Sequence, residues 1–170
     1  EECGVHPGNI LVITFTKAAA EEMKERYETK VGAGKGTVNF GTFHAVFFKI
    51  LRFAYNYEAA NILKEDERYK ILREIVCARM QQEITDEKEF VEAISGEISR
   101  VKNERFALES YYSANCPDEV FREIYTEYDR WLRKENKVDF DDMQLLCCEL
   151  LSKRTDILRQ WQQKYTYVLI

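Results

Sequence analysis

The sequence predicts an α/β fold in which a parallel sheet is interrupted by a mostly helical inserted subdomain, with helices dominating overall. Two apolar runs predict the sheet, NILVITFT at residues 9–16 and YTYVLI at residues 165–170. The helices are predicted because 170 residues contain only 7 glycines and 2 prolines, which favours long uninterrupted elements. With 45% apolar and 32% charged residues, the composition is that of a globular protein.

The first segment, residues 1–55, begins with a strand and a helix. Residues 9–16 combine an unbroken apolar run with β-branched side chains, which is typical of a strand buried on both faces. The apolar side chains that follow recur three or four positions apart, as on one face of a helix: Ala20, Met23, Tyr27 and Val31. Gly32 is expected to end this helix as its C-cap.

A second strand and a second helix complete this segment. The stretch TVNF at residues 37–40 is predicted to be a short strand, and it leads into a helix over residues 42–55, with Thr42 well placed as the N-cap. A strand–helix–strand order joins parallel strands, so residues 1–55 are predicted to form the first part of the α/β domain.

Residues 56–136 show no strand pattern and are predicted to form a helical insertion. Apolar side chains line one helical face in residues 65–82, in residues 86–103, and again after Pro117. We expect these three stripes to pack together as a core. Residues 137–170 are then expected to resume the α/β domain and to end in a buried strand.

Three aspartates open this last segment. Clustered carboxylates attract hard cations, but the calcium-loop pattern D-x-[DN]-x-[DN]-G is absent. Acidic residues directly before MQLLCCELL also suit the N-cap and first turn of a helix. We therefore expect Asp139, Asp141 and Asp142 to begin a helix, and we expect no metal site.

The run GAGKGT at residues 32–37 suggests a nucleotide-binding loop, as in a nucleotide kinase. The pattern G-x-x-x-x-G-K-[ST] requires glycine where Thr29 stands and a hydroxyl residue where Gly36 stands. The predicted order here is helix, loop and strand, whereas a phosphate-binding loop follows a strand and begins a helix. We expect a loop without nucleotide, while the kinase alternative predicts that Lys35→Ala abolishes nucleotide binding.

Cysteine usage and charge restrict the class of protein. Five cysteines form no C-x-x-C pair and are expected to be buried, reduced thiols in a cytoplasmic protein. They are Cys3, Cys77, Cys116, Cys147 and Cys148. The net charge of −5 argues against a general nucleic-acid coat. Residues 1–55 nevertheless carry 7 Lys and Arg against 6 Asp and Glu, so a local phosphate-binding surface can lie there. No apolar run approaches the roughly 20 residues of a membrane span, so no membrane partner is expected.

Three stretches resemble the UvrD/Rep/PcrA group of superfamily 1 DNA helicases. ILVITFTKAAAEEMKER (10–26) is similar to their motif Ia, GTFHAVFFKILR (41–52) to motif Ib, and VDFDDMQLL (138–146) to the stretch before the Walker B strand. The final YTYVLI resembles the Walker B strand itself. The resemblance implies a partial RecA-like motor domain at residues 1–55 and 137–170. Helicase-nucleases of the AddA or RecB type remain an alternative within the group.

This resemblance implies a fragment of an ATP-dependent DNA helicase. The parent protein would use ATP and Mg²⁺, translocate 3′ to 5′ on single-stranded DNA, and separate duplex DNA in repair or recombination in the bacterial cytoplasm. Its partners would be single-stranded DNA and single-strand–duplex junctions. The fragment lacks the Walker A lysine and the Walker B Asp-Glu pair, so alone it is expected to be inactive and to bind neither cofactor. The alternative is a non-catalytic helical interaction module with a degenerate motor core.

In the family, motifs Ia and Ib line the single-stranded DNA track. The resemblance therefore implies six DNA-binding residues: Phe15, Thr16, Lys17, Thr42, Phe43 and His44. Phe15 would stack on a base, and Thr16 would meet a phosphate at a helix N-terminus. Lys17 replaces the family's usual Asn, and it either contacts phosphate or points to solvent.

The motif Ib residues have structural alternatives as well. Thr42 can cap its helix and contact DNA at the same time. Phe43 either packs in the core or contacts DNA. His44 alone would be a structural histidine, but within the T-F-H sequence we expect it to contact a phosphate or sugar.

Overall fold

The structure is a computed structural model, and it describes residues 4–32, 37–80 and 86–170. The chain divides into two compact units. The first unit comprises residues 1–56 and 146–170, and the second comprises residues 57–145. The domain boundaries predicted from the sequence, between residues 55 and 56 and between residues 136 and 137, remain predictions.

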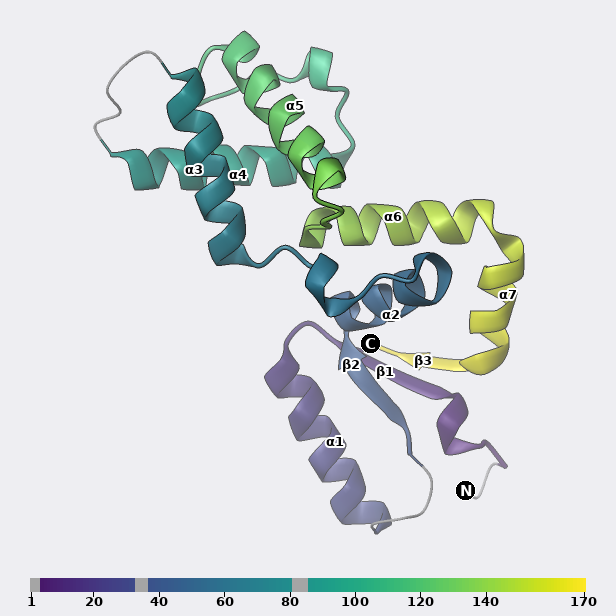
Figure 1. The fold of residues 1–170 in the computed structure, drawn as a ribbon. Helices are drawn as coiled ribbons and strands as arrows, with labels where there is room; N and C mark the ends of the chain where they lie inside the picture. The colour runs from purple at the N-terminus through teal and green to yellow at the C-terminus, as the bar shows by residue number, and fades with distance from the viewer. Residues whose placement is uncertain (1–3, 33–36, 81–85) are drawn as a thin grey trace. The chain divides into compact units, whose positions relative to one another are not determined.

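A three-stranded parallel sheet forms the centre of the first unit (Figure 1). The strand order is β2–β1–β3, with β1 at Ile10–Thr14, β2 at Asn39–Thr42 and β3 at Tyr167–Leu169. Strands β1 and β2 pair from Leu11 opposite Asn39 to Thr14 opposite Thr42. The predicted parallel sheet is confirmed, and both strands end at the same edge.

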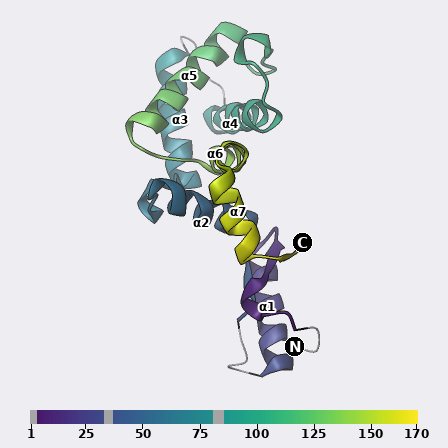
Figure 2. The same cartoon turned by 90° about the vertical axis from the view of Figure 1, so that its right-hand side faces the viewer.

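Helices flank this sheet. α1 (Lys17–Val31) packs along β2 and β1, while α2 (Phe43–Tyr55) and α7 (Thr155–Lys164) supply side chains that cover β1. The small core of this unit consists of Leu11, Ile13 and Tyr165, with Phe43, Val46 and Trp161 packed against it. Figure 2 shows α7 running down to β3. Gly32 ends α1 with φ of +84°, a conformation that suits glycine, so the predicted C-cap is confirmed.

The burial predicted for the strands is partly wrong. In β1, side chains alternate between buried and half-buried, because Leu11 and Ile13 alone face the core. The three residues of β3 are all exposed, with Leu169 at 56%. This strand pairs with β1 on one side, and the described residues leave its side chains largely uncovered. α7 is not among the predicted elements.

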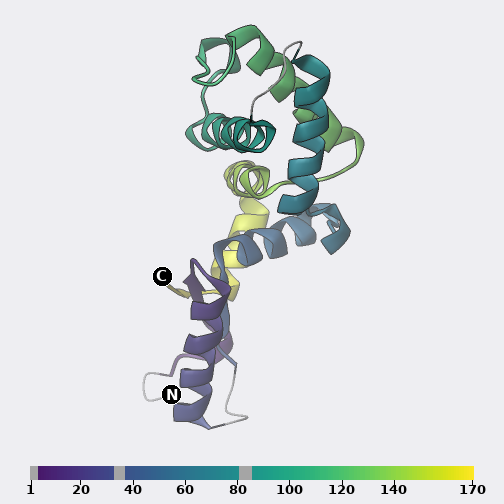
Figure 3. The same cartoon turned by 90° about the vertical axis from the view of Figure 1, so that its left-hand side faces the viewer.

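The second unit is helical, as predicted. It contains α3 (Glu65–Arg79), α4 (Glu87–Glu104), α5 (Asp118–Lys134) and the start of α6 (Phe140–Lys153). Figure 3 shows α3 and α5 beside α4, which is seen nearly end-on. The three predicted apolar stripes meet in one core, which confirms their packing. Its fully buried members include Leu72, Val76, Ile94, Ile98, Phe121, Ile124, Tyr128 and Leu132.

A short parallel bridge joins two segments of the second unit, one near its start and one shortly before α6. Ile62 pairs with Val138, the Leu63 N–H donates to the Val138 carbonyl at 2.9 Å, and the Val138 N–H donates to the Asn61 carbonyl at 2.8 Å. Short 3₁₀ turns at Pro7–Asn9, Ala59–Asn61 and Leu108–Ser110 complete the described elements.

Some sequence-based predictions lie outside the described residues. The structure does not describe most of the GAGKGT run, including Lys35, nor does it describe Cys3. The four described cysteines are free thiols, but only Cys147 is buried, so the predicted burial is wrong for Cys77 and Cys148, which lie exposed on helix surfaces. No described helix is both long and apolar enough to cross a bilayer.

Candidate nucleic-acid interface

The ends of β1 and β2 bring both predicted DNA-binding groups to one edge of the sheet. Thr14 and Thr42 are paired residues, and each strand leads at once into a helix, α1 at Lys17 and α2 at Phe43. Because the two strands are parallel neighbours, the N-termini of both helices lie at this edge (Figure 1). We call residues 15–17 and 42–44 the strand-end edge.

A threonine caps each of these helices. The Thr16 hydroxyl accepts a hydrogen bond from the Ala19 N–H at 3.2 Å, and the Thr42 hydroxyl accepts one from the Ala45 N–H at 3.3 Å. The N-cap predicted for Thr42 is confirmed. A helix N-terminus carries a partial positive charge and N–H groups without intrahelical partners, so the edge offers two favourable places for a phosphate.

Two aromatic rings lie between these helix starts. The Phe15 side chain is 83% exposed, and its ring centroid lies 5.1 Å from that of Phe43. Phe43 is half-buried, packs against Leu11 and Ile13, and lies 6.1 Å from Phe47. Core packing of Phe43 is therefore confirmed, and the same ring supports the exposed one. Its contact with DNA stays a prediction.

The two remaining residues of the edge are polar and exposed. The Lys17 ammonium lies 3.5 Å from the Glu21 carboxylate, and the Lys17 side chain is 87% exposed. His44 is an exposed residue in the first turn of α2. Both lie beside the aromatic rings in sequence and are accessible from solvent, and their roles in DNA binding stay predictions.

An apolar hollow of about 610 Å³ adjoins the strand-end edge. Among its lining residues are Val12, Phe15, Met23, Phe40 and Leu169. The described residues that line it carry no positive charge, and their polar side chains are threonine and tyrosine hydroxyls. A nucleotide triphosphate needs cationic and N–H-rich surroundings, so this hollow does not fit ATP.

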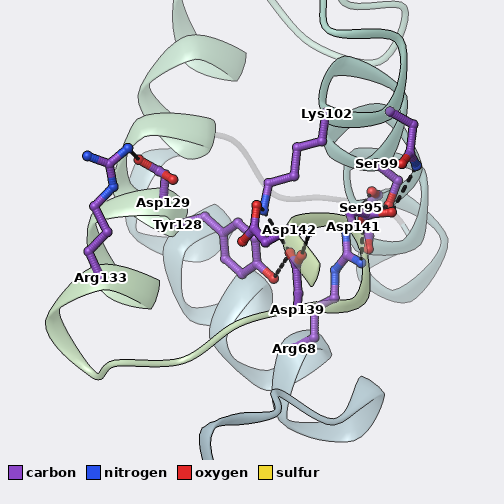
Figure 4. A network of polar contacts seen from close by, with 11 residues as sticks. Arg68, Ser95, Ser99, Lys102, Tyr128, Asp129, Arg133, Asp139, Asp141 and Asp142 are labelled. Carbon is purple, nitrogen blue, oxygen red and sulfur yellow. Dashed lines mark hydrogen bonds and ion pairs between the residues drawn. The ribbon is translucent and has the colours of Figure 1, made fainter. Parts of the chain in front are cut away.

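A second polar site, which we call the charge cluster, lies in the second unit (Figure 4). It consists of Arg68, Lys102, Asp139, Asp141 and Asp142. The Asp139 carboxylate accepts the Asp142 N–H at 2.7 Å, which confirms the predicted cap of α6. In the described part of the chain, no group of three or more His, Cys, Asp or Glu side chains is arranged to hold a metal ion.

The two cations of this cluster are missed by the sequence-based prediction. Lys102 follows the buried Ile98 by four residues, and Arg68 precedes the buried Leu72 by four. A long charged side chain at core-facing helical spacing is the signal that points to a buried ion pair.

Comparison with known proteins gives one family match over the whole chain. The model of the UvrD/REP helicase N-terminal domain matches residues 1–170. The chain is 34% identical to the putative ATP-dependent DNA helicase YjcD of Bacillus subtilis, a match over 100% of the chain and 23% of that protein. It is 33% identical to the ATP-dependent DNA helicase PcrA of the same organism, over 96% and 23%. It is also 37% identical to DNA helicase II of Rickettsia typhi, over 96% and 26%. The chain thus spans about a quarter of the length of these curated relatives.

Proposed function

The chain belongs to the UvrD/REP helicase N-terminal domain family, and we propose that it is part of an ATP-dependent DNA helicase motor. The family match over all 170 residues and the helicase names of the relatives support this proposal. The chain covers only about a quarter of those relatives, so ATP hydrolysis with Mg²⁺ is assigned to the parent protein.

Within this motor, the proposed role of the strand-end edge is to grip single-stranded DNA. The observation that carries this role is the Phe15 ring, which is 83% exposed and whose centroid lies 5.1 Å from that of the half-buried Phe43 ring. Water is a poor environment for an aromatic ring, and a DNA base that stacks on it gains roughly 1–3 kcal/mol. Every base has a flat face, so this contact suits a motor that moves along any sequence.

The helix starts on either side supply the contacts to the DNA backbone. N–H groups at the N-termini of α1 and α2 favour phosphate oxygens, and Thr16 and Thr42 hold both helix starts in place. Lys17 adds a cation, and His44 adds a hydrogen-bond donor to phosphate or sugar. This arrangement binds the backbone and a base without reading sequence.

The finer parts of the proposal follow from the family. The parent protein translocates 3′ to 5′ on single-stranded DNA, acts at single-strand–duplex junctions, and serves DNA repair or recombination. The apolar hollow beside the edge does not fit ATP, so no nucleotide site is proposed there.

Fluorescence anisotropy with a labelled oligothymidine tests the grip in the full-length protein. Phe15→Ala is expected to weaken binding by roughly 5- to 150-fold, which corresponds to the loss of one stacked base. The control is Phe53→Ala, which removes an exposed phenylalanine near the other end of α2 and is expected to leave the affinity unchanged.

Two results would contradict the proposal. Equal affinities of the wild type and Phe15→Ala remove the assigned role of the edge. Absence of single-stranded DNA binding by the full-length protein favours the other candidate, a non-catalytic helical interaction module with a degenerate motor core.

A further inference from the structure

The charge cluster of the second unit contains three acids and two bases, and most of its charge is buried. Lys102 is 3% exposed, Asp139 is 1% exposed, and Arg68 is buried as well. A buried ion is tolerated only where an opposite charge and hydrogen bonds compensate for lost hydration. The distribution of partners therefore decides which carboxylates remain ionised.

Asp141 is fully supplied with partners. It accepts hydrogen bonds from Arg68 at 3.1 Å, from the Ser99 hydroxyl at 2.6 Å and from the Asn103 amide at 2.9 Å. Arg68 is in turn fixed by the Ser99 hydroxyl at 2.9 Å and by the Ser95 carbonyl at 3.2 Å. Asp141 and Arg68 thus pair mainly with each other, although the Arg68 Nε is buried and has no hydrogen-bond partner among the described residues.

The other base is shared by two acids (Figure 4). The Lys102 ammonium lies 2.8 Å from an Asp139 oxygen and 2.8 Å from an Asp142 oxygen, above the Tyr128 ring. Asp139 also accepts the Tyr128 hydroxyl at 2.9 Å and the Asp142 N–H at 2.7 Å. Among the described residues, Lys102 is the only partner of the Asp142 carboxylate, whose side chain is 21% exposed.

We propose that Lys102 fixes the first turn of α6 by bridging two carboxylates that differ in ionisation: Asp139 stays ionised, while Asp142 exchanges a proton with solvent. The two acids differ because Asp139 has three donors and almost no exposure, whereas Asp142 has one donor and access to water. The site is a proton-binding site at the start of a helix.

The groups around Asp142 determine the direction of the effect. Burial, the largest cause, and the Asp139 charge together raise the pKa of Asp142 to about 6, although the Lys102 charge acts in the opposite direction. On α5, Asp129 also raises it, while Tyr125 and Tyr128 are neutral neighbours because burial raises the pKa of each hydroxyl. Burial would also raise the pKa of Asp139, but Lys102, the Asp142 N–H and the Arg68 guanidinium of α3 outweigh it and hold that pKa below its ordinary value.

A raised pKa in the folded state means that the folded protein binds a proton that the unfolded chain has already lost. Stability contributed by Asp142 is therefore largest in acid, and it decreases as the pH rises through the folded pKa of about 6. Neutralising Asp142 is expected to tighten the start of α6 at pH 8, although it removes one partner of Lys102.

Hydrogen exchange of the backbone at the start of α6, corrected for the intrinsic exchange rate, tests this in the full-length protein. From pH 5 to pH 8 the protection of residues 140–150 is expected to fall about tenfold in the wild type, given an ordinary aspartate in the open state. Asp142→Asn is expected to remove this fall and to exceed the wild-type protection at pH 8.

The matched control is Asp66→Asn, the same substitution at an exposed aspartate in the first turn of α3. It is expected to leave the pH dependence of residues 140–150 unchanged. Asp142→Ser repeats the test if the asparagine variant does not fold. A wild-type fall that persists in a folded Asp142 variant overturns the proposal, as does wild-type protection that is independent of pH. The experiment contains no DNA, so its outcome is separate from that of the proposed grip.

Discussion

The strand-end edge and the charge cluster use polar groups in opposite ways. The edge has few charges, and Phe15, Thr16, Lys17 and His44 are exposed to solvent. The charge cluster has five charged side chains that contact one another and their neighbours within the second unit. Polar groups that pair with one another in the interior contribute to the specificity and stability of the fold, whereas groups exposed at the surface are accessible to a ligand. Mutations should therefore affect stability in one region and binding in the other.

The largest effect on stability is expected for Lys102→Met in the charge cluster. The variant leaves the Asp139 carboxylate buried without its cation, which should reduce the free energy of unfolding of the second unit by about 3–5 kcal/mol. Denaturant-dependent hydrogen exchange of peptides from α4 and α5 measures this change. In the control Arg100→Met, an exposed ion pair with Glu104 is lost, and the expected change is below about 0.5 kcal/mol.

A double variant sharpens the same prediction. Lys102→Met combined with Asp139→Asn removes both charges, so it should be more stable than Lys102→Met alone. A double variant that is less stable than the single variant would show that the packing of Lys102, and not its charge, dominates.

A smaller effect is expected at Phe43, where the edge and the core of the first unit meet. Phe43→Ala should lower the free energy of unfolding of the first unit, because the ring packs against the core. The expected loss is only about 2 kcal/mol, since the ring is half-buried. Phe15→Ala should change it by less than about 0.5 kcal/mol. Hydrogen exchange of β1 peptides in both variants measures the difference. Equal destabilisation by the two substitutions would contradict the assignment of Phe43 to the core and of Phe15 to the exposed surface.

The helix caps are expected to contribute less again. Thr42→Ala should destabilise α2 by about 1 kcal/mol, because the hydroxyl that accepts the Ala45 N–H is lost. Thr42→Ser keeps this hydroxyl and should restore most of the stability. The protection of residues 43–47 in the two variants measures the cap, and equal protection would show that the hydrogen bond contributes little.

Lys17→Ala should have the smallest effect on stability, below about 0.5 kcal/mol, because its ion pair with Glu21 is exposed. Its effect should appear in DNA binding. If the ammonium neutralises one phosphate, the slope of log affinity against log salt concentration should decrease by about 0.7. An unchanged slope in a salt titration would place Lys17 in solvent only. Lys24→Ala, which removes another exposed lysine of α1, is the control.

Local patterns predict much of the strand-end edge. The alternation of strand and helix in residues 1–55, the Gly32 C-cap and the Thr42 N-cap depend on neighbouring residues, and the structure confirms them. The second strand, predicted at residues 37–40, lies two residues later, at Asn39–Thr42. Two parallel strands that each lead into a helix also place their ends together. The contact between Phe15 and Phe43 could not be predicted, because ring positions depend on how β1 and α2 pack.

The charge cluster was predictable only in part. The cap by Asp139 is local, whereas Lys102 lies 37 residues from Asp139, and Arg68 lies 73 residues from Asp141. Such pairs depend on helix packing that periodicity does not specify. The exposure of β3 has the same origin, because the residues that cover a strand are set by tertiary structure and not by its own apolar sequence.

The bridge between Ile62 and Val138 holds the chain that leads into α3 beside the chain that leads from α5 into α6. An insertion with adjoining ends can lengthen, shorten or be exchanged while the host chain keeps its connectivity. The hydrogen bonds that hold these two chain segments together are formed by residues of the second unit alone.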